Sequence, residues 1–196
     1  MKITTFVDYF EGYTEAIVPR KYGKGYKLVR IYTGNYHVHD ITDRQWVLKK
    51  LLYTGLIMAT MLLYILSGVS KTSGNATVFV AAFSGLAVFS LVFTLVSCIT
   101  YICNPREMTI FAWKRSSYGI KRWCFITAIC LFCVATISFI HMLVYSMGNF
   151  FPELICSLGY GLSGFFALAM NKIEAKTEYY EKHNDVQIPF YPEADL

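Results

Sequence analysis

The chain has 196 residues, of which 55% are hydrophobic and only 16% are charged, and its formal net charge is +5 at pH 7. This composition excludes an ordinary soluble domain. A helix needs about 20 apolar residues to cross a bilayer, and four segments without Asp, Glu, Lys or Arg approach or exceed that length: 51–69, 76–102, 123–147 and 154–170. The sequence therefore predicts an all-α integral membrane protein with four transmembrane helices arranged as two antiparallel hairpins.

The basic residues are distributed unevenly around these spans. Nine Lys and Arg precede residue 51, five lie in the loop 105–122 and three follow residue 170, whereas the two other loops together hold only Lys71. Basic residues near span ends mark the cytoplasmic side. We therefore expect both termini and the central loop to be cytoplasmic in the plasma (cell inner) membrane, where anionic lipid headgroups would attract them.

This topology divides the chain into a cytoplasmic N-terminal region (1–47), a transmembrane domain (48–171) and a cytoplasmic tail (172–196). Residues 1–19 have one early Lys and then acidic residues where a cleavable signal peptide would be apolar. The first span is therefore expected to serve as the insertion signal.

Within the N-terminal region, residues 5–17 place apolar and acidic side chains on different helical faces, which predicts a short amphipathic helix. Residues 26–32 and 36–41 flank Gly34-Asn35 and predict a β-hairpin. His37 and His39 would share one face of its second strand, but two ligands do not complete a structural metal site. No metal ion or cofactor is predicted.

Between residues 19 and 39, basic residues alternate with tyrosines and no acidic residue occurs. This pattern suits single-stranded nucleic acid as well as a lipid headgroup interface. A span that begins twelve residues later favours lipid, and no nucleic acid partner is expected.

The ends of the helical region carry local signals. Thr42 with Gln45 three residues later forms a capping box, which predicts a helix from Asp43 to about Val69. The last helix is expected to continue beyond residue 170, with Glu178 and Lys182 as an i,i+4 pair. The prolines of the tail segment 186–192 favour an extended chain, either a strand that docks on a partner or a frayed end.

Two residues in the spans are candidates for chemistry. His141 is the one acid–base side chain inside a predicted span, and ionisable residues in membranes are often functional. Gly161-Leu-Ser163-Gly164 resembles the G-x-S-G motif of rhomboid intramembrane proteases, which implies a Ser163 nucleophile with His141 as its base. The resemblance covers four residues, and rhomboids have six core helices and a histidine that follows the serine.

The same stretch fits a structural role. Small residues four apart let helices approach closely, and this spacing relates Ser157 to Gly161, Gly159 to Ser163 and Ala167, and Ala81 to Gly85. The six cysteines, including Cys130-x-x-Cys133, are expected to remain free and largely inert thiols. No pair of carboxylates lies within the predicted spans, which argues against an ion-coupled transporter.

Charge-poor spans with glycine notches offer surface for contact and little for catalysis. The sequence therefore favours a non-enzymatic protein that binds another membrane component as an accessory, assembly or protective subunit. Its partner would be a membrane protein or a second copy of the chain. The alternatives are a small oligomeric transporter or channel, and an intramembrane hydrolase that uses Ser163 and His141.

Overall fold

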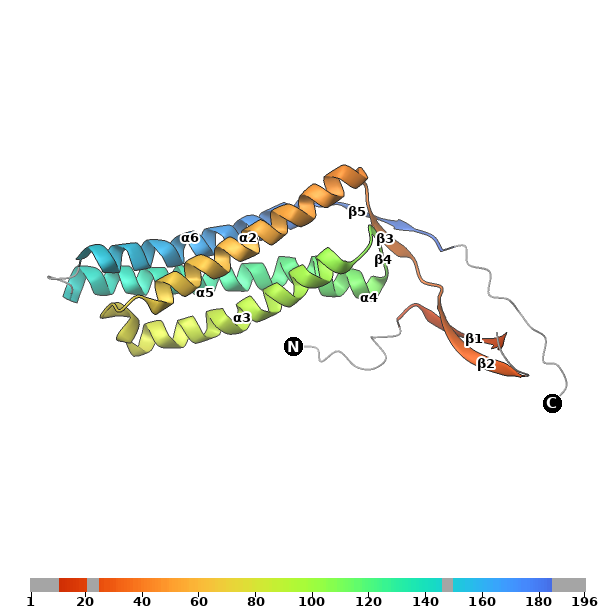
Figure 1. The fold of residues 1–196 in the computed structure, drawn as a ribbon, viewed down its shortest axis with the longest axis horizontal. Coiled ribbons are helices and arrows are strands. Elements are labelled where there is room, and N and C mark those ends of the chain that lie inside the picture. Colours follow the sequence, from red (N-terminus) through yellow and green to blue (C-terminus); the bar gives the residue numbers. More distant parts are fainter. Residues whose placement is uncertain (1–10, 21–24, 146–149, 185–196) are drawn as a thin grey trace. The chain divides into compact units, whose positions relative to one another are not determined.

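A computed structural model describes residues 11–20, 25–145 and 150–184 (Figure 1). The chain divides into two compact units. The helical unit comprises Ile41–Cys103 and Arg115–Thr177, and the β unit comprises the described parts of Met1–Asp40, Asn104–Lys114 and Glu178–Leu196.

The helical unit contains four long helices, α2 (Asp43–Val69), α3 (Val78–Cys103), α5 (Gly119–Tyr145) and α6 (Phe150–Ala175). Each is long and apolar enough to cross a membrane. This result confirms the mostly helical fold with four candidate spans. A 3-10 turn (Gly74–Ala76) lies between α2 and α3, and a π-helical turn (Lys114–Tyr118) leads into α5.

The four helices pack side by side, as Figure 1 shows. Helix α5 packs against both α3 and α6, and α2 packs mainly against α6, whereas α2 and α3 share few contacts. The central core includes Leu131 and Val134 of α5 with Tyr160 of α6. Helix α3 is therefore an edge of this bundle.

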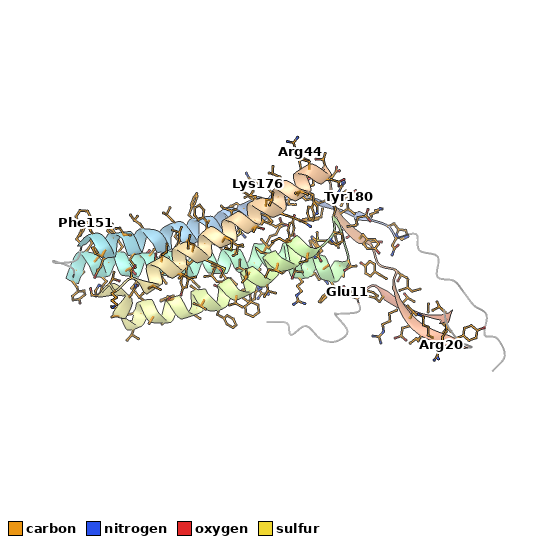
Figure 2. The ribbon with its side chains drawn as sticks, in the orientation of Figure 1. Glu11, Arg20, Arg44, Phe151, Lys176 and Tyr180 are labelled. Carbon is orange, nitrogen blue, oxygen red and sulfur yellow. The ribbon has the colours of Figure 1, made fainter. Side chains whose placement is uncertain are left out.

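One end of the helical unit carries most of its charge. Figure 2 shows Arg44 and Lys176 at this end, and Phe151 at the opposite end. Other charged side chains near this end lie just before α5, in the first turn of α5, in the first turns of α2 and in the last turns of α6. Clustered cations at a single end are the pattern expected of a positive-inside membrane domain.

The start of α2 follows the sequence prediction. The Thr42 hydroxyl accepts a hydrogen bond from the Gln45 amide (3.3 Å), and the Gln45 side chain accepts one from the Thr42 amide (3.0 Å). This capping box is confirmed, and α2 ends at Val69 as predicted. Its two hydrogen bonds satisfy amides that lack a partner in the first helical turn.

The β unit contains two small sheets. Strands β1 (Tyr13–Pro19) and β2 (Tyr26–Tyr32) form an antiparallel pair. Strand β3 (Tyr36–His39) lies between β4 (Glu107–Met108) and β5 (Tyr179–Lys182), antiparallel to both. A short helix, α4 (Ile110–Trp113), follows β4.

Tyr32 joins the parts of the β unit. Its buried hydroxyl donates to the carbonyl of Asn35 (2.7 Å) and accepts from the amide of Ile110 (3.1 Å). Its ring also contacts Tyr13 and Tyr36, with centroids 5.1 and 5.0 Å away. Burial raises the pKa of the Tyr32 hydroxyl above its ordinary value.

The structure corrects the predicted N-terminal helix. Residues 1–10 lie outside the described residues, residues 11 and 12 form a turn, and residues 13–17 fall in strand β1. Gly12 has a positive φ of 81°, which an α-helix does not accommodate. The β-branched residues after it then pair with β2 along its whole length.

A small N-terminal β-hairpin is confirmed, but its strands are β1 and β2, and the predicted pairing across Gly34-Asn35 is wrong. Residues 26–32 and 36–39 are strands, but β2 pairs with β1 while β3 pairs with β4 and β5. At the other end of the chain, α6 stops at Ala175, so Glu178 and Lys182 form no helical pair. Lys182 instead forms an ion pair with Glu107 (2.7 Å), which raises the pKa of Lys182.

Candidate functional site

Helix α6 carries two buried carboxylates, one near each end. Glu153 lies in its first turn and is 2% exposed, and Glu174 lies in its last turn and is fully buried. The predicted fourth span, 154–170, ended just short of both residues. The observed helix Phe150–Ala175 extends beyond this span at both ends and contains both carboxylates.

The Glu153 cluster consists of Glu153, His141 and Ser73. The Ser73 hydroxyl donates to Oε1 of Glu153, and Nδ1 of His141 lies 3.6 Å from Oε2. Gly74 comes close to the imidazole, because a Cβ at this position would lie 3.6 Å from the same Nδ1. This arrangement places an acid–base pair beneath the turn that joins α2 to α3.

Asn75 fixes the same turn from inside. Its side-chain amide donates to the carbonyls of Ser67 and Ser70, both at 2.9 Å, and its carbonyl oxygen accepts from the Tyr160 hydroxyl at 3.3 Å. The Asn75 side chain is therefore fully engaged in contacts within the helical unit. The Cys156 thiol also donates to the Ser67 carbonyl (3.2 Å).

The Glu174 cluster lies near the end of the helical unit that carries its basic residues. The Glu174 carboxylate accepts hydrogen bonds from the hydroxyls of Tyr53 and Ser117, both at 2.5 Å, and pairs with Nζ of Lys49 at 3.0 Å. Thr177 receives a hydrogen bond from Lys49 in turn (2.5 Å). Because a buried carboxylate is costly without partners, this set of donors holds α2 and the segment before α5 against α6.

The π-helical turn contributes one of these donors. Such turns occur mainly as single insertions in α-helices, often at functional positions. Here the turn brings Ser116 and Ser117 to fully buried positions, and Ser117 reaches Glu174. The segment that leads into α5 is therefore fixed to α6 by a side-chain contact.

The structure does not bring Ser163 to His141. The Ser163 hydroxyl is buried and donates to the carbonyl of Thr60 on α2 (2.7 Å). His141 lies beside Glu153, and Ser163 follows Glu153 by ten residues, about 15 Å along α6. The two candidates therefore belong to different levels of the bundle, and Ser163 connects two helices.

Several predicted packing residues lie between helices. A Cβ at Gly159 would overlap the hydroxyl oxygen of Ser67. At Gly164, which was not among the predicted packing residues, a Cβ would lie 3.3 Å from Leu131. Ser157 donates to the carbonyl of Ala135 (2.9 Å). Gly161 faces the same residue, since its Cβ would lie 3.9 Å from the Ala135 Cβ, and Ala167 is fully buried.

The small-residue pair on α3, Ala81 and Gly85, is called the α3 notch and lies in a more open environment. Ala81 and Gly85 are exposed, and a Cβ at Gly85 would meet no atom within 4 Å. In this respect Gly85 differs from Gly159 and Gly164, where an added Cβ would meet a neighbouring helix. The space beside Gly85 is therefore not filled by the glycine-rich face of α6.

The remaining candidates carry little chemistry. His37 stacks on Trp113 with ring centroids 4.5 Å apart, and His39 contacts Tyr179. No group of three potential metal ligands occurs in the described parts of the chain. All six cysteines are free thiols, and only Cys103 is exposed.

One sequence signal could have found both carboxylates. The buried residues of α6 recur every three or four positions: Glu153, Cys156, Ser157, Tyr160, Ser163, Gly164, Ala167, Met170 and Glu174. This spacing places both glutamates on the stripe that faces the other helices. The predicted span 154–170 was limited to uncharged residues, so both glutamates were left out although they lie on this stripe.

The fold and the site together define a helical unit of four candidate membrane spans with a carboxylate cluster near each end of α6. Comparisons of this chain with protein-family models, with curated proteins and with solved structures found no match.

Proposed function

We propose that this chain is a multi-pass protein of the plasma membrane (the cell inner membrane) that acts by binding another membrane component, as an accessory, assembly or protective subunit. The observation that carries this proposal is the open notch on α3. Ala81 and Gly85 are exposed on an edge helix, where Gly85 has free space beyond its Cα. Small residues four apart are the usual contact surface for a second transmembrane helix.

The position of the notch supports this proposal. Val92 and Val96 lie one turn apart on the same outward face of α3 and are exposed, as is Phe89 beside them. At about 100° per residue, Gly85 lies near the centre of this face. A partner helix that crossed α3 at Gly85 could approach the backbone and also cover these apolar side chains.

The interior of the helical unit gives a second argument. Its polar side chains connect helices of the same chain, as Ser163 does with Thr60, Thr94 with Thr127 (3.1 Å), and Tyr64 with Ser84 (2.6 Å). Hydroxyls used in this way stabilise the bundle. They are poor candidates for a nucleophile, which needs a base within hydrogen-bond reach.

The charge distribution defines the expected membrane contact. In the proposed orientation, both termini are cytoplasmic and the cations of the charged end face anionic headgroups. Each Lys or Arg near such a surface contributes about 1 kcal/mol of attraction. Trp46 and Lys50 lie in the first turns of α2, where a cation–π contact (5.0 Å) joins them at the expected headgroup level.

Site-specific photocrosslinking in native membranes tests the α3 proposal. A photoreactive residue at Phe89 should give one discrete adduct, and Gly85→Leu should reduce its yield strongly by filling the notch. Leu86→Phe is the matched control, because it adds bulk to the side of the same face and should leave the adduct unchanged. An adduct that persists in Gly85→Leu would overturn the proposal.

The adduct also separates the two kinds of partner. If the mass of the adduct equals that of this chain plus a different protein, the result supports the proposal of an accessory subunit. An adduct of two copies would instead favour the second candidate, a small oligomeric transporter or channel.

The Glu153 cluster is the specific observation that favours this second candidate. A buried carboxylate beside a histidine can take up and release protons. Purified chain in liposomes should then support proton or cation flux that Glu153→Gln abolishes. Absence of flux above that of protein-free liposomes excludes this candidate.

A further inference from the structure

The β1–β2 hairpin has a base and a tip. The base lies at Tyr32, whose hydroxyl accepts from the Ile110 amide (3.1 Å) and donates to the Asn35 carbonyl (2.7 Å). The tip lies at the turn, where the Arg20 amide donates to the Gly25 carbonyl (3.0 Å); Arg20 is labelled in Figure 2. The base is therefore held by contacts with the segments that begin α4 and precede β3, and the tip is the end farther from these contacts.

The two faces of this hairpin differ in exposure. Side chains alternate between the faces along each strand, so Ile17, its cross-strand partner Leu28, and Tyr26 share one face. These side chains are 54%, 61% and 52% exposed, respectively. On the opposite face Ala16 is buried and its partner Val29 is half-buried. The outward face of an antiparallel sheet is usually polar, but here the more exposed face is apolar near the tip.

Positive charge lies beside these apolar side chains. Arg20 follows β1, Lys27 lies between Tyr26 and Leu28 on β2, and both cations are exposed. The sequence contains no Asp or Glu from residue 16 to residue 39. Nearer the base, in contrast, Glu15 forms an ion pair with Arg30 (3.0 Å). The charge at the tip therefore favours an anionic partner.

These exposed side chains are called the tip patch: Ile17, Arg20, Tyr26, Lys27 and Leu28. Residues 21–24 lie outside the described residues and are not included in it. We propose that the tip patch binds the anionic lipid headgroups of the membrane. Its three apolar side chains enter the boundary between headgroups and acyl chains, and its two cations contact the headgroups. This proposal rests on the membrane location and the cytoplasmic N-terminal region of the proposed function, and it is independent of the partner at the α3 notch.

The side chains of the tip patch favour lipid over single-stranded nucleic acid. Proteins that bind single strands without sequence preference stack successive bases on several aromatic rings. The tip patch has one aromatic ring, Tyr26, beside the aliphatic pair Ile17 and Leu28. Aliphatic side chains are stabilised when they leave water for the apolar side of the headgroup region, where tyrosine is also enriched. The same chain carries four candidate membrane spans, which keep a bilayer at high effective concentration.

Fluorescence quenching in nanodiscs tests this contact in the full-length chain. The fluorophore NBD is attached to Leu28→Cys in a Cys103→Ser background, which removes the exposed native thiol. Thr14→Cys is the matched control, because Thr14 is exposed on the opposite face, near the base. The Cys103→Ser chain without a new cysteine gives the background signal.

The nanodiscs contain phosphatidylserine, phosphatidylcholine and a phosphatidylcholine with a nitroxide quencher on its acyl chain. The Leu28 probe should lose most of its emission, because NBD at this position lies against the bilayer. The Thr14 probe should keep most of its emission. Without phosphatidylserine, the Leu28 probe should also keep most of its emission, because the attraction between the cations and the headgroups is lost.

Charge variants of the Leu28 probe chain measure the part played by the cations. Lys27→Gln should lower the ratio of lipid-bound to free hairpin about fivefold, the factor expected for one basic side chain near an anionic surface. Lys182→Gln is the matched control, because it removes the same charge from β5, where Lys182 pairs with Glu107. This control should change the ratio much less.

Three results would overturn the proposal. The first is equal quenching of the Leu28 and Thr14 probes, and the second is equal quenching with and without phosphatidylserine. The third is a change in Leu28 emission when a single-stranded thymidine oligonucleotide is added to phosphatidylcholine nanodiscs, which would assign the patch to nucleic acid. Failure of the chain to enter nanodiscs would instead contradict the membrane location itself. Crosslinking at the α3 notch does not involve the hairpin, so the two proposals can fail separately.

Discussion

At the scale of single residues, Glu174 makes the largest expected contribution to stability. Its carboxylate is buried among Lys49, Tyr53 and Ser117. Removing one partner of a buried ion pair costs about 3–5 kcal/mol, because the other charge remains buried and uncompensated. We predict that Glu174→Leu lowers the unfolding free energy in detergent by about this amount.

Two variants control this prediction. Lys49→Met in the Glu174→Leu background removes the uncompensated cation and should recover part of the loss. Glu15→Gln breaks the exposed Glu15–Arg30 pair (3.0 Å), which should cost no more than about 1 kcal/mol. If Glu174→Leu is no more destabilising than Glu15→Gln, the cluster does not fix the helices.

Gly159 sets the distance between α2 and α6. A Cβ at this position would overlap the Ser67 hydroxyl oxygen, whereas its next neighbour, the Ser67 Cβ, lies at 3.4 Å. Gly159→Ala should therefore lower the thermal midpoint in detergent, and adding Ser67→Ala should restore it by removing the overlapping atom. Gly55→Ala, where a Cβ meets nothing within 4 Å, should be neutral or slightly stabilising. Failure of Ser67→Ala to rescue would locate the cost elsewhere.

At the scale of elements, the sequence predicted helices better than strand partners. The α2 boundaries were predictable because a capping box is local, with all of its atoms within four residues. The partners of β3 lie about 70 and 143 residues away, at β4 and β5. Alternation of side chains identifies a strand but carries no information about the strand that it pairs with.

In the candidate site, too, the sequence identified one residue and missed its neighbour. His141 was recognisable because it is an ionisable residue within an apolar run. Its neighbour Glu153 was not recognisable, because a charged residue ends an apolar run in the sequence even where the helix extends past that residue. Only the three-dimensional contact with Ser73, 80 residues earlier in the sequence, shows that this carboxylate is inside the bundle.

The β4–β3–β5 sheet should lose stability in acid. His37 stacks on Trp113, its Nε2 is buried, and burial lowers the pKa of its imidazole, while the Glu181 carboxylate partly opposes this shift. An unfolded histidine has a pKa of about 6.5. Below this pH the unfolded chain takes up a proton before the folded chain does, so stability is full above about pH 6.5 and falls as the pH decreases.

Protection factors for the β3 amides check this prediction. They should be smaller at pH 5.5 than at pH 7.5 in the native chain. In His37→Phe, which retains an aromatic ring on Trp113, the difference should shrink, and His183→Gln should leave it unchanged because His183 is exposed. An undiminished difference in His37→Phe would assign the acid sensitivity to another group.

At the scale of the whole molecule, the proposed orientation in the membrane is based on the distribution of charge. Seventeen of the eighteen Lys and Arg precede residue 51, lie in the loop 105–122 or follow residue 170, and Lys71 alone lies in the other loops. The alternating direction of the four helices brings the start of α2, the end of α3, the start of α5 and the end of α6 to the same end. The opposite orientation would require these cations to cross the membrane, which the positive-inside rule disfavours.

We therefore predict opposite labelling of Lys71→Cys and Lys176→Cys, both exposed in the helical unit. In a Cys103→Ser background, which removes the exposed native thiol, a membrane-impermeant maleimide should label Lys71→Cys in intact cells. It should label Lys176→Cys only after the membrane is permeabilised. The reversed pattern would invert the topology while leaving four spans. Recovery of the chain in the soluble fraction without detergent would contradict the membrane assignment itself, because four apolar helices whose outward faces carry Leu, Ile, Val and Phe need lipid to cover them.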